Sequence, residues 1–440
     1  MAMKVEPTPW QIQHPNAAGI DVGSAEHYVA VPVDRCEKPI RSFGSCTAEL
    51  QALADWLSQC GVDTVAMEAT GVYWIALYEL LSERGFKVCV TDARRAQNVS
   101  GRKSDVLDCQ WLQQLMSYGL LVSAFIPDES ICQLRTVTRE RKRLVSEHGR
   151  RVQLMQKALT QMNVQLATVL TELDGWSGLA ILREIVAGER DPQKLAELCD
   201  YRVHASKEEV ARSLQGTWRR EHLLCLANAL AEYDFLQGLM NKCDVELEQL
   251  LKGLARHGGE LPKSKKRGGK NAPQFDLRSA LYHFAGVDLT RIGGIDVQTA
   301  LVVLTEVGWD LSKFPNVKHF TSWLGLCPGT RISGGKRIGG ATKRTCNRLT
   351  LALKLAAQGL TRSRCSLGAF YRTKALRMGT AKAITATAHK LARLIYTMLS
   401  KGEEYVERSE ADYEQQHRER TLRALQNKAA QFGMQLVAAV

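Results

Sequence analysis

Apolar residues in the first third of the chain form two kinds of pattern. Short apolar runs at 17–23, 27–34, 41–45, 62–69 and 86–92 are typical of β-strands bounded by turn residues. Residues 48–60, 73–85 and 103–119 instead repeat apolar side chains at the three- and four-residue spacing of an amphipathic helix. The order is three strands, then helix, strand, helix, strand and helix, which predicts an α/β domain.

The pattern becomes helical over long stretches from about residue 130. Residues 131–166 contain few helix breakers and predict a long helix or a helical coiled-coil middle, and a second long helix over 221–254 can return antiparallel to it. One face of the first helix carries Arg139, Arg141, Lys142, Arg143, Arg150 and Arg151. A basic coiled coil can pair two subunits and lie along nucleic acid, whereas a plain helical spacer with a solvated face explains the same pattern.

A segment rich in Gly, Pro and Lys at 257–275 predicts a mobile basic linker. Beyond it, residues 289–308 predict a helix, a turn at Gly293 and Gly294, and another helix, as in helix-hairpin-helix modules that bind phosphate. An ordinary turn is the alternative. The predicted parts are an α/β domain at 1–128, a helical connector at 129–256, the linker at 257–275, a mostly helical basic domain at 276–406 and a charged tail at 407–440.

The net charge of +13 changes this picture because of where it lies. Residues 276–404 contain 20 Lys and Arg against 7 Asp and Glu, so the remaining sequence is balanced at 39 of each. A concentrated positive field favours a polyanion, most simply nucleic acid, although a membrane-surface patch or solubility explains it as well. No long apolar run or signal-peptide core is present, and the twelve cysteines lack metal-site spacing, so a reducing cytoplasm is expected.

Four acidic residues fall at the ends of the predicted N-terminal elements. Asp21 interrupts the first apolar strand, Glu68 ends the fourth, and Asp105 and Asp108 share one face of the last helix. A carboxylate inside a buried strand is costly unless it is paired or binds a cation. Together the four suit two Mg²⁺ ions, which can clamp the attacking and leaving oxygens of a phosphoryl transfer. Each acid alone is also compatible with a turn or a solvated helix face.

The stretch from Arg331 to Arg344 holds five basic residues, four glycines and Ser333, with no acid. It has three interpretations: a flexible solvated loop, a passive phosphate-binding loop, or the position of a nucleophile. Glycine permits close approach of a phosphate, and cations offset charge in a transition state. The residues of the stretch expected to bind nucleic acid are Arg331, Gly334, Gly335, Lys336, Arg337, Lys343 and Arg344.

Three N-terminal motifs resemble those of the DEDD transposases of bacterial insertion sequences: GIDVGSAEHYVAV, AMEATGVYW and GRKSDVLDCQWL. The resemblance implies a ribonuclease H-like (RuvC-like) fold in which Asp21, Glu68, Asp105 and Asp108 are catalytic and bind metal. Lys103 fits the K-x-D-x-x-D pattern of the family, where it is expected to contact a phosphate or the carboxylates, or to be a surface lysine.

The C-terminal order W-L-G-L-x-P-G-T-x-x-S-G-G-K is similar to the second domain of the same transposases, in which the serine is the nucleophile. This implies that Ser333 attacks DNA. The sequence departs from the family just beyond the stretch, where Thr345 and Cys346 replace a usual Gly-Asn pair and Thr350 stands near a usual Arg. No DNA contact is inferred for these three residues.

The resemblance implies a recombinase that cuts and rejoins element-end and target DNA through a 5′-phosphoserine link. It further implies a dimer or tetramer, a non-coding guide RNA, no membrane association, and a place at the nucleoid of a bacterial cytoplasm. Two rival functions remain. One is a Holliday-junction-type nuclease that hydrolyses DNA with metal-activated water, and the other is a nucleic-acid-binding protein without enzymatic activity.

Overall fold

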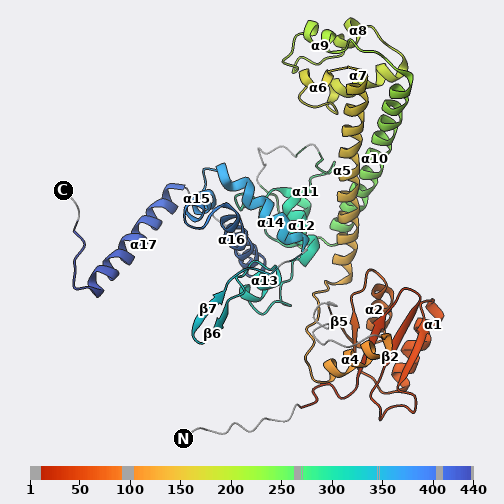
Figure 1. The fold of residues 1–440 in the computed structure, drawn as a ribbon, viewed down its shortest axis with the longest axis vertical. Coiled ribbons are helices and arrows are strands. Elements are labelled where there is room, and N and C mark those ends of the chain that lie inside the picture. Colours follow the sequence, from red (N-terminus) through yellow and green to blue (C-terminus); the bar gives the residue numbers. More distant parts are fainter. Residues whose placement is uncertain are drawn as a thin grey trace. The chain divides into compact units, whose positions relative to one another are not determined.

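The computed structural model describes residues 11–91, 104–261, 269, 271–343, 345, 347–402 and 410–437. The chain divides into two compact units, Met1–Ile126 and Pro127–Val440 (Figure 1). A mixed α/β N-terminal unit precedes a mostly helical one, as the apolar pattern predicts. The finer division into five parts stays a prediction.

The N-terminal unit is built on a five-stranded sheet in the order β3-β2-β1-β4-β5. The central strand β1 is antiparallel to β2 and parallel to β4, and β4 is parallel to β5. The elements follow the predicted order. They are β1 (Ala17–Val22), β2 (Glu26–Ala30), β3 (Ile40–Gly44), α1 (Thr47–Gln59), β4 (Thr64–Glu68), α2 (Trp74–Glu83), β5 (Lys87–Thr91) and α4 (Asp105–Ser117).

Helices cover both faces of this sheet. Alternate residues of β1, Ala18, Ile20 and Val22, are buried in a core with leucines of α1 and α2. On the opposite face, Ala17 of β1 and Ala66 of β4 are buried with Leu112 and Met116 of α4. Because successive side chains of a strand point to opposite faces, the odd-numbered positions of β1 and the even-numbered positions of β4 face α4.

The C-terminal unit begins with two long helices, α5 (Glu129–Gln161) and α10 (Arg220–Gly253), which pack antiparallel (Figure 1). Their prediction as long helices is confirmed, whereas a coiled coil stays a prediction. Short helices share a buried core with the end of α5 and the start of α10. They are α6 (Leu166–Val169), α7 (Trp176–Ala187), α8 (Pro192–Glu197) and α9 (Lys207–Ser213).

The predicted basic face of α5 is largely neutralised within the chain. The guanidinium of Arg141 is buried and makes a two-pronged ion pair with Asp244 of α10, which is also buried. The other four arginines of the face also pair with carboxylates, on α5, α10 or α12 (Val297–Val307). The buried pair of Arg141 and Asp244 joins the two helices, and the expectation that this face lies along nucleic acid stays a prediction.

The remaining elements of the unit are α11 (Leu277–Ala285), η1 (Leu289–Arg291), α12 (Val297–Val307), α13 (Val317–Trp323), β6 (Arg331–Ser333), β7 (Lys336–Gly339), α14 (Arg348–Gly359), η2 (Leu360–Arg362), α15 (Ser366–Met378), α16 (Thr380–Lys401) and α17 (Glu410–Gln431). Among them, α12 packs against α5, α11 and α14, and α16 packs against α13, α14 and α15. Residues 262–268 and 270 of the predicted linker lie outside the described residues.

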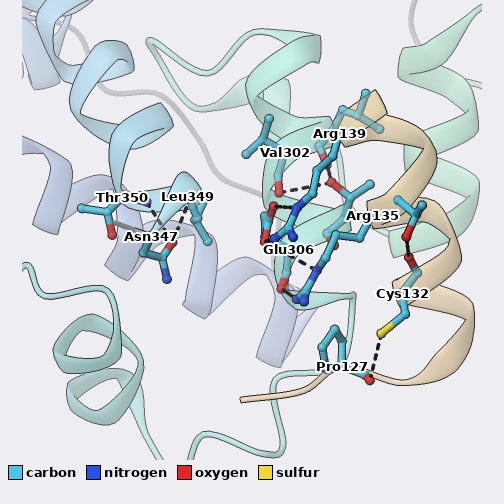
Figure 2. Close-up of polar contacts among 12 residues, drawn as sticks. Pro127, Cys132, Arg135, Arg139, Val302, Glu306, Asn347, Leu349 and Thr350 are labelled. Carbon is cyan, nitrogen blue, oxygen red and sulfur yellow. Dashed lines mark hydrogen bonds and ion pairs between the residues drawn. The ribbon is translucent and has the colours of Figure 1, made fainter. Parts of the chain in front are cut away.

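Two arginines of α5 anchor this helical part (Figure 2). Arg139 donates from Nε and Nη2 to the two carboxylate oxygens of Glu306 on α12, at 3.0 and 2.7 Å. Arg135 donates to the backbone carbonyls of Thr305 and Glu306, at 3.3 and 2.6 Å. The last carbonyls of α12 would otherwise lack intrahelical donors, so these contacts end the helix and fix it to α5.

Among the described helices, none has the length and apolar character needed to cross a membrane.

Candidate active site

The acidic residues of the N-terminal unit meet on the α4 side of the sheet. Asp21 follows Gly19 by two positions on β1, so both face α4. Glu68 ends β4 two positions after Ala66, whose side chain is buried against α4. Since Ile20 pairs with the residue preceding Glu68, the two carboxylate-bearing positions lie side by side on neighbouring parallel strands.

The start of α4 supplies the other two acids. Ser104 caps the helix by accepting a hydrogen bond from the backbone of Leu107, and Asp105 and Asp108 lie in the first turn. Carboxylates are favoured there because the first amides of a helix carry partial positive charge. The spacing of three places both side chains on one face, as the sequence predicts.

Gly19 sets how close α4 lies to the sheet. A Cβ at this position would fall 2.2 Å from the backbone oxygen of Cys109 and 2.3 Å from the backbone nitrogen of Gln113. Such distances are far inside van der Waals contact, so only glycine lets α4 rest directly on β1. The signal for this contact in the sequence is a glycine inside an apolar strand, which is typical of close backbone approach.

The charges of these acids act on one another. Burial, followed by the negative charges of Asp105 and Asp108, raises the pKa of Asp21 from 3.8 to about 6. Burial is also the main cause that raises the pKa of the Cys109 thiol to about 12, with Asp21 and Asp108 adding to it. Burial and the charges of Asp105 and Asp108 therefore disfavour the ionised form of Asp21 and favour a cation beside it.

Tyr28 is a further residue of this site that the sequence does not reveal. It lies opposite Asp21 in the antiparallel pairing of β1 and β2, so the two side chains share a face. Its hydroxyl donates to the carboxylate of Glu26 at 3.1 Å, and this bond is the main cause that raises the pKa of Tyr28, with a smaller contribution from Asp105.

The donor set fits a hard divalent cation, because it consists of carboxylate oxygens and because Asp105 and Asp108 raise the pKa of Asp21. Within the described ranges, however, no three His, Cys, Asp or Glu side chains converge at metal-binding distances. The carboxylates thus lie near one another but do not form a complete metal-binding site within the described residues. Lys103, predicted beside them, lies outside the described residues.

In the C-terminal unit, the stretch that contains Ser333 is a β-hairpin and not the loop that the sequence suggests (Figure 1). Gly334 and Gly335 connect β6 to β7 with φ of +54° and +73°. Positive φ at both positions defines the two-residue type I′ turn, whose twist matches antiparallel strands. The glycines are therefore required by the turn itself.

The pairing of the hairpin places Ser333 directly across from Lys336. Opposite residues of an antiparallel pair point to the same face, with Cβ atoms roughly 5 Å apart. Both side chains are exposed, as is Lys343 beyond the hairpin. Arg331 and Arg337 lie in the strands, and Arg344 lies outside the described residues.

A buried hydrogen bond joins α14 to the end of α13, on the two sides of the hairpin in the sequence. Thr350 is 2% exposed, and its hydroxyl donates to the backbone oxygen of Leu324 at 2.6 Å. Asn347 caps α14 by accepting from the amides of Leu349 and Thr350 (Figure 2). Near the position of a usual arginine of the family, this chain therefore has a buried threonine that makes a structural hydrogen bond. Cys346 lies outside the described residues.

Gly293 and Gly294 follow a short 3-10 turn and not the longer helix that the sequence predicts. Gly294 has φ of +86°, and a Cβ there would meet the side chain of Leu360 at 2.8 Å. It also lines a cavity of about 670 Å³ between α5, α12 and α14. Packing explains this glycine, and the contact with a phosphate stays a prediction.

Comparison with known proteins places the chain in a class. A model of DEDD transposases named for IS110, described as a transposase, matches residues 18–164, a range that contains all four acids. A second model, described as the transposase IS116/IS110/IS902 family, matches residues 287–372, a range that contains Ser333. Together the two cover more than half of the chain. The protein belongs to the IS110 family of DEDD transposases.

A curated relative agrees with this assignment over part of its length. It is a protein of Streptomyces coelicolor described as the insertion element IS110 uncharacterized 43.6 kDa protein, and it is 32% identical over 128 residues. The matched part spans 29% of this chain and 31% of the relative, so the chain aligns with about a third of that protein.

The close approach at Gly19 predicts a specific sensitivity. Gly19→Ala should lower the free energy of unfolding by about 1–3 kcal/mol, since the new methyl group meets backbone that cannot move aside. Urea unfolding followed by circular dichroism measures this. Gly44→Ala is the matched control, because its Cβ would meet only the Glu49 side chain, at 3.3 Å. Equal effects of the two substitutions would contradict the role of Gly19.

The raised pKa of Asp21 predicts a pH-dependent stability. Between pH 3.8 and about 6 the folded protein binds a proton more readily than the unfolded chain, so this residue lowers stability as pH rises through that window. Without metal, the free energy of unfolding of Asp21→Asn at pH 8 should therefore exceed that of the wild type by about 1 kcal/mol, after allowance for partial exposure, and the variant should melt at a higher temperature. The difference should shrink towards pH 4.

Thermal melts with a chelator across this pH range measure the effect, and exposed Asp34→Asn serves as the control. Addition of Mg²⁺ should raise the melting temperature of the wild type and leave Asp21→Asn unchanged. A wild type that melts as high as Asp21→Asn at pH 8 would show that the repulsion is absent.

Proposed function

We propose that this chain is a transposase that cuts and rejoins the DNA of an insertion sequence through a Ser333 nucleophile. The proposal rests on one observation: each of the two ranges that match the family contains one of the chemical groups that the reaction needs. An acid cluster with a raised pKa at Asp21 lies in the first matched range, and an exposed serine on a basic hairpin lies in the second.

The proposed reaction is a transesterification at a DNA phosphate. The Oγ of Ser333 bonds to phosphorus, the bond from phosphorus to the 3′ oxygen breaks, and that oxygen leaves as a hydroxyl after taking up a proton. The product is a 5′-phosphoserine and a free 3′-OH. A 3′-OH of another strand then attacks the phosphoserine, joins the strands and releases Ser333 with its proton restored. No external energy source is needed, because one phosphodiester is exchanged for another.

The hairpin suits this attack for reasons of geometry and charge. Ser333 is exposed at the end of β6, so its hydroxyl can reach a large substrate. Lys336 is on the same face and provides a cation for the non-bridging oxygens, where negative charge increases in the transition state. A serine hydroxyl is a weak nucleophile near neutral pH, so it requires such activation.

The N-terminal unit supplies the other half of the proposal. Asp21, Glu68, Asp105 and Asp108 would hold Mg²⁺, which when bound supplies Lewis-acid stabilisation to the scissile phosphate and the leaving oxygen. The sheet order, with β1 between β2 and β4 and α4 on one face, supports a ribonuclease H-like domain of the RuvC type. Because the pKa of Asp21 is raised to about 6, its carboxyl group is mostly ionised above that pH, and the ionised form is the one that binds a cation.

Partners are part of the same proposal. Element-end and target DNA are the substrates, and a non-coding RNA of the element is proposed to select them by base pairing. The excess of cations over acids in residues 276–404 suits both polyanions. We further propose a dimer or tetramer, in which the acidic unit of one subunit and the hairpin of another act on one phosphate.

A covalent adduct tests the proposed function. Labelled element-end DNA is incubated with the full-length protein, Mg²⁺ and co-purified RNA, and the mixture is then denatured. We expect a protein–DNA adduct that Ser333→Ala abolishes and Ser322→Ala retains, since Ser322 is an exposed serine on nearby α13. Asp21→Asn should also abolish it. Cleaved ends without an adduct would instead indicate the water-dependent nuclease.

The turn glycines give a second test, which separates their backbone role from contact with the phosphate. Gly335→Ala forces a Cβ into the left-handed region and should lower adduct yield about tenfold, for a strain of about 1–2 kcal/mol. Gly334→Asn should keep the yield within about threefold, because Asn-Gly is a favoured type I′ turn. Equal losses in the two variants would show that the space left by glycine matters more than its φ.

A further inference from the structure

The hairpin carries two large apolar side chains that the proposed reaction does not use. Ile332 is 68% exposed and Ile338 is 70% exposed. Isoleucine is among the residues most often buried in proteins. Two exposed isoleucines on adjacent strands of one short hairpin therefore call for an explanation beyond folding.

The register of the hairpin relates these isoleucines to the nucleophile. Ile332 directly precedes Ser333 on β6, so its side chain points to the opposite face of the ribbon. The pairing shifts between Arg331 and Ile332, which leaves Ile338 as the extra residue on β7. Such a bulge bends the strand and redirects a side chain. One face of the ribbon thus presents Ser333 and Lys336, and the other presents Ile332.

The chemistry of the stretch identifies what covers these side chains. The described side chains of the hairpin are all exposed, so no packing within the described structure buries them. A two-stranded hairpin alone is only marginally stable in water, which favours an external partner. The stretch 331–344 has five basic residues and no acid, so that partner is a polyanion with an apolar surface. A nucleic acid strand with an unstacked base has both properties.

We infer that Ile332 and Ile338 form a wedge that packs against a base displaced from the stack next to the phosphate attacked by Ser333. This rests on the proposed function. Ser333 and Lys336 lie on the backbone of the cleaved DNA strand, while Ile332 on the opposite face and Ile338 at the bulge occupy the place that the base leaves. Burial of two isoleucines is comparable in size to the cost of unstacking one base step. The wedge would expose the phosphate to the serine.

Fluorescence of 2-aminopurine, which rises when the base leaves the stack, tests the wedge without any chemical step. Full-length protein with Ser333→Ala binds element-end duplexes that carry the probe at successive positions, with co-purified RNA and Mg²⁺. We expect a rise at one position. It should fall roughly tenfold with Ile332→Ala or Ile338→Ala, because burying each side chain shifts an equilibrium by about that factor or more.

Two further variants define the comparison. Leu376→Ala removes a leucine that is 91% exposed on α15, away from the hairpin, and should leave the rise unchanged. Ile332→Met keeps an apolar side chain and should retain most of the rise. Circular dichroism melts check that each variant is folded.

A rescue experiment separates the wedge from a general loss of binding. In protein that keeps Ser333, Ile332→Ala should form little adduct on a perfect duplex. It should recover on a duplex with a mismatch at the responsive position, because the base is already loosened. Recovery supports the wedge, and equal yields on both duplexes overturn it.

The remaining outcomes are also decisive. A fluorescence rise that survives in both isoleucine variants overturns the wedge, as does DNA binding by anisotropy with no rise at any position. If the wild type forms no adduct but the rise depends on the isoleucines, the nucleophile proposal fails and the wedge stands. If no DNA binds, both fail.

Discussion

The contact between the backbone of α4 and strand β1 at Gly19 is the constraint on which the N-terminal site depends. With no side chain at this position, the helix lies directly on the sheet, and its first turn comes within electrostatic range of Asp21. A larger residue would separate the strand-borne acids from the helix-borne ones. Alanines at neighbouring positions on the same face, Ala17 and Ala66, extend the small-residue surface on which α4 rests. The geometry of the carboxylates is therefore a consequence of close packing.

The two units differ in the surroundings of their buried or partly buried charged side chains. In the C-terminal unit, the buried charges are neutralised: Arg141 pairs with Asp244, and Glu306 receives Arg139 and Arg135. These pairs join helices and fix their register. In the N-terminal unit, Asp21 is held among other acids, so its ionised form is disfavoured. A protein keeps such repulsion where a cation relieves it, because perturbed carboxylates cluster at functional sites. The paired charges of the C-terminal unit thus contrast with Asp21, whose ionised form is disfavoured by its acidic neighbours.

Local periodicity predicted the elements well, and long-range contacts explain what it missed. The strands, the helices and the four acids follow from spacing along the chain. The role of Gly19 depends on residues some 90 positions away, and the pairing of Arg141 with Asp244 spans 103. Neither is visible in a local pattern, which is why the α5 face was interpreted as a free basic surface. The hairpin was within reach, since two glycines between short runs indicate a type I′ turn. The high Gly and basic content favoured a loop instead.

A covalent intermediate places a mechanical demand on the hairpin. In the proposed exchange, Ser333 must hold a DNA end until another 3′-OH arrives, so the strand that bears it has to stay in position through two chemical steps. Its type I′ turn sets the twist of the strands, and the hydrogen bond from Thr350 to Leu324 fixes α14 to the end of α13, just before the hairpin. Neither feature covers the ribbon, whose described side chains stay exposed. The faces can then serve the substrate, because the fold does not need them.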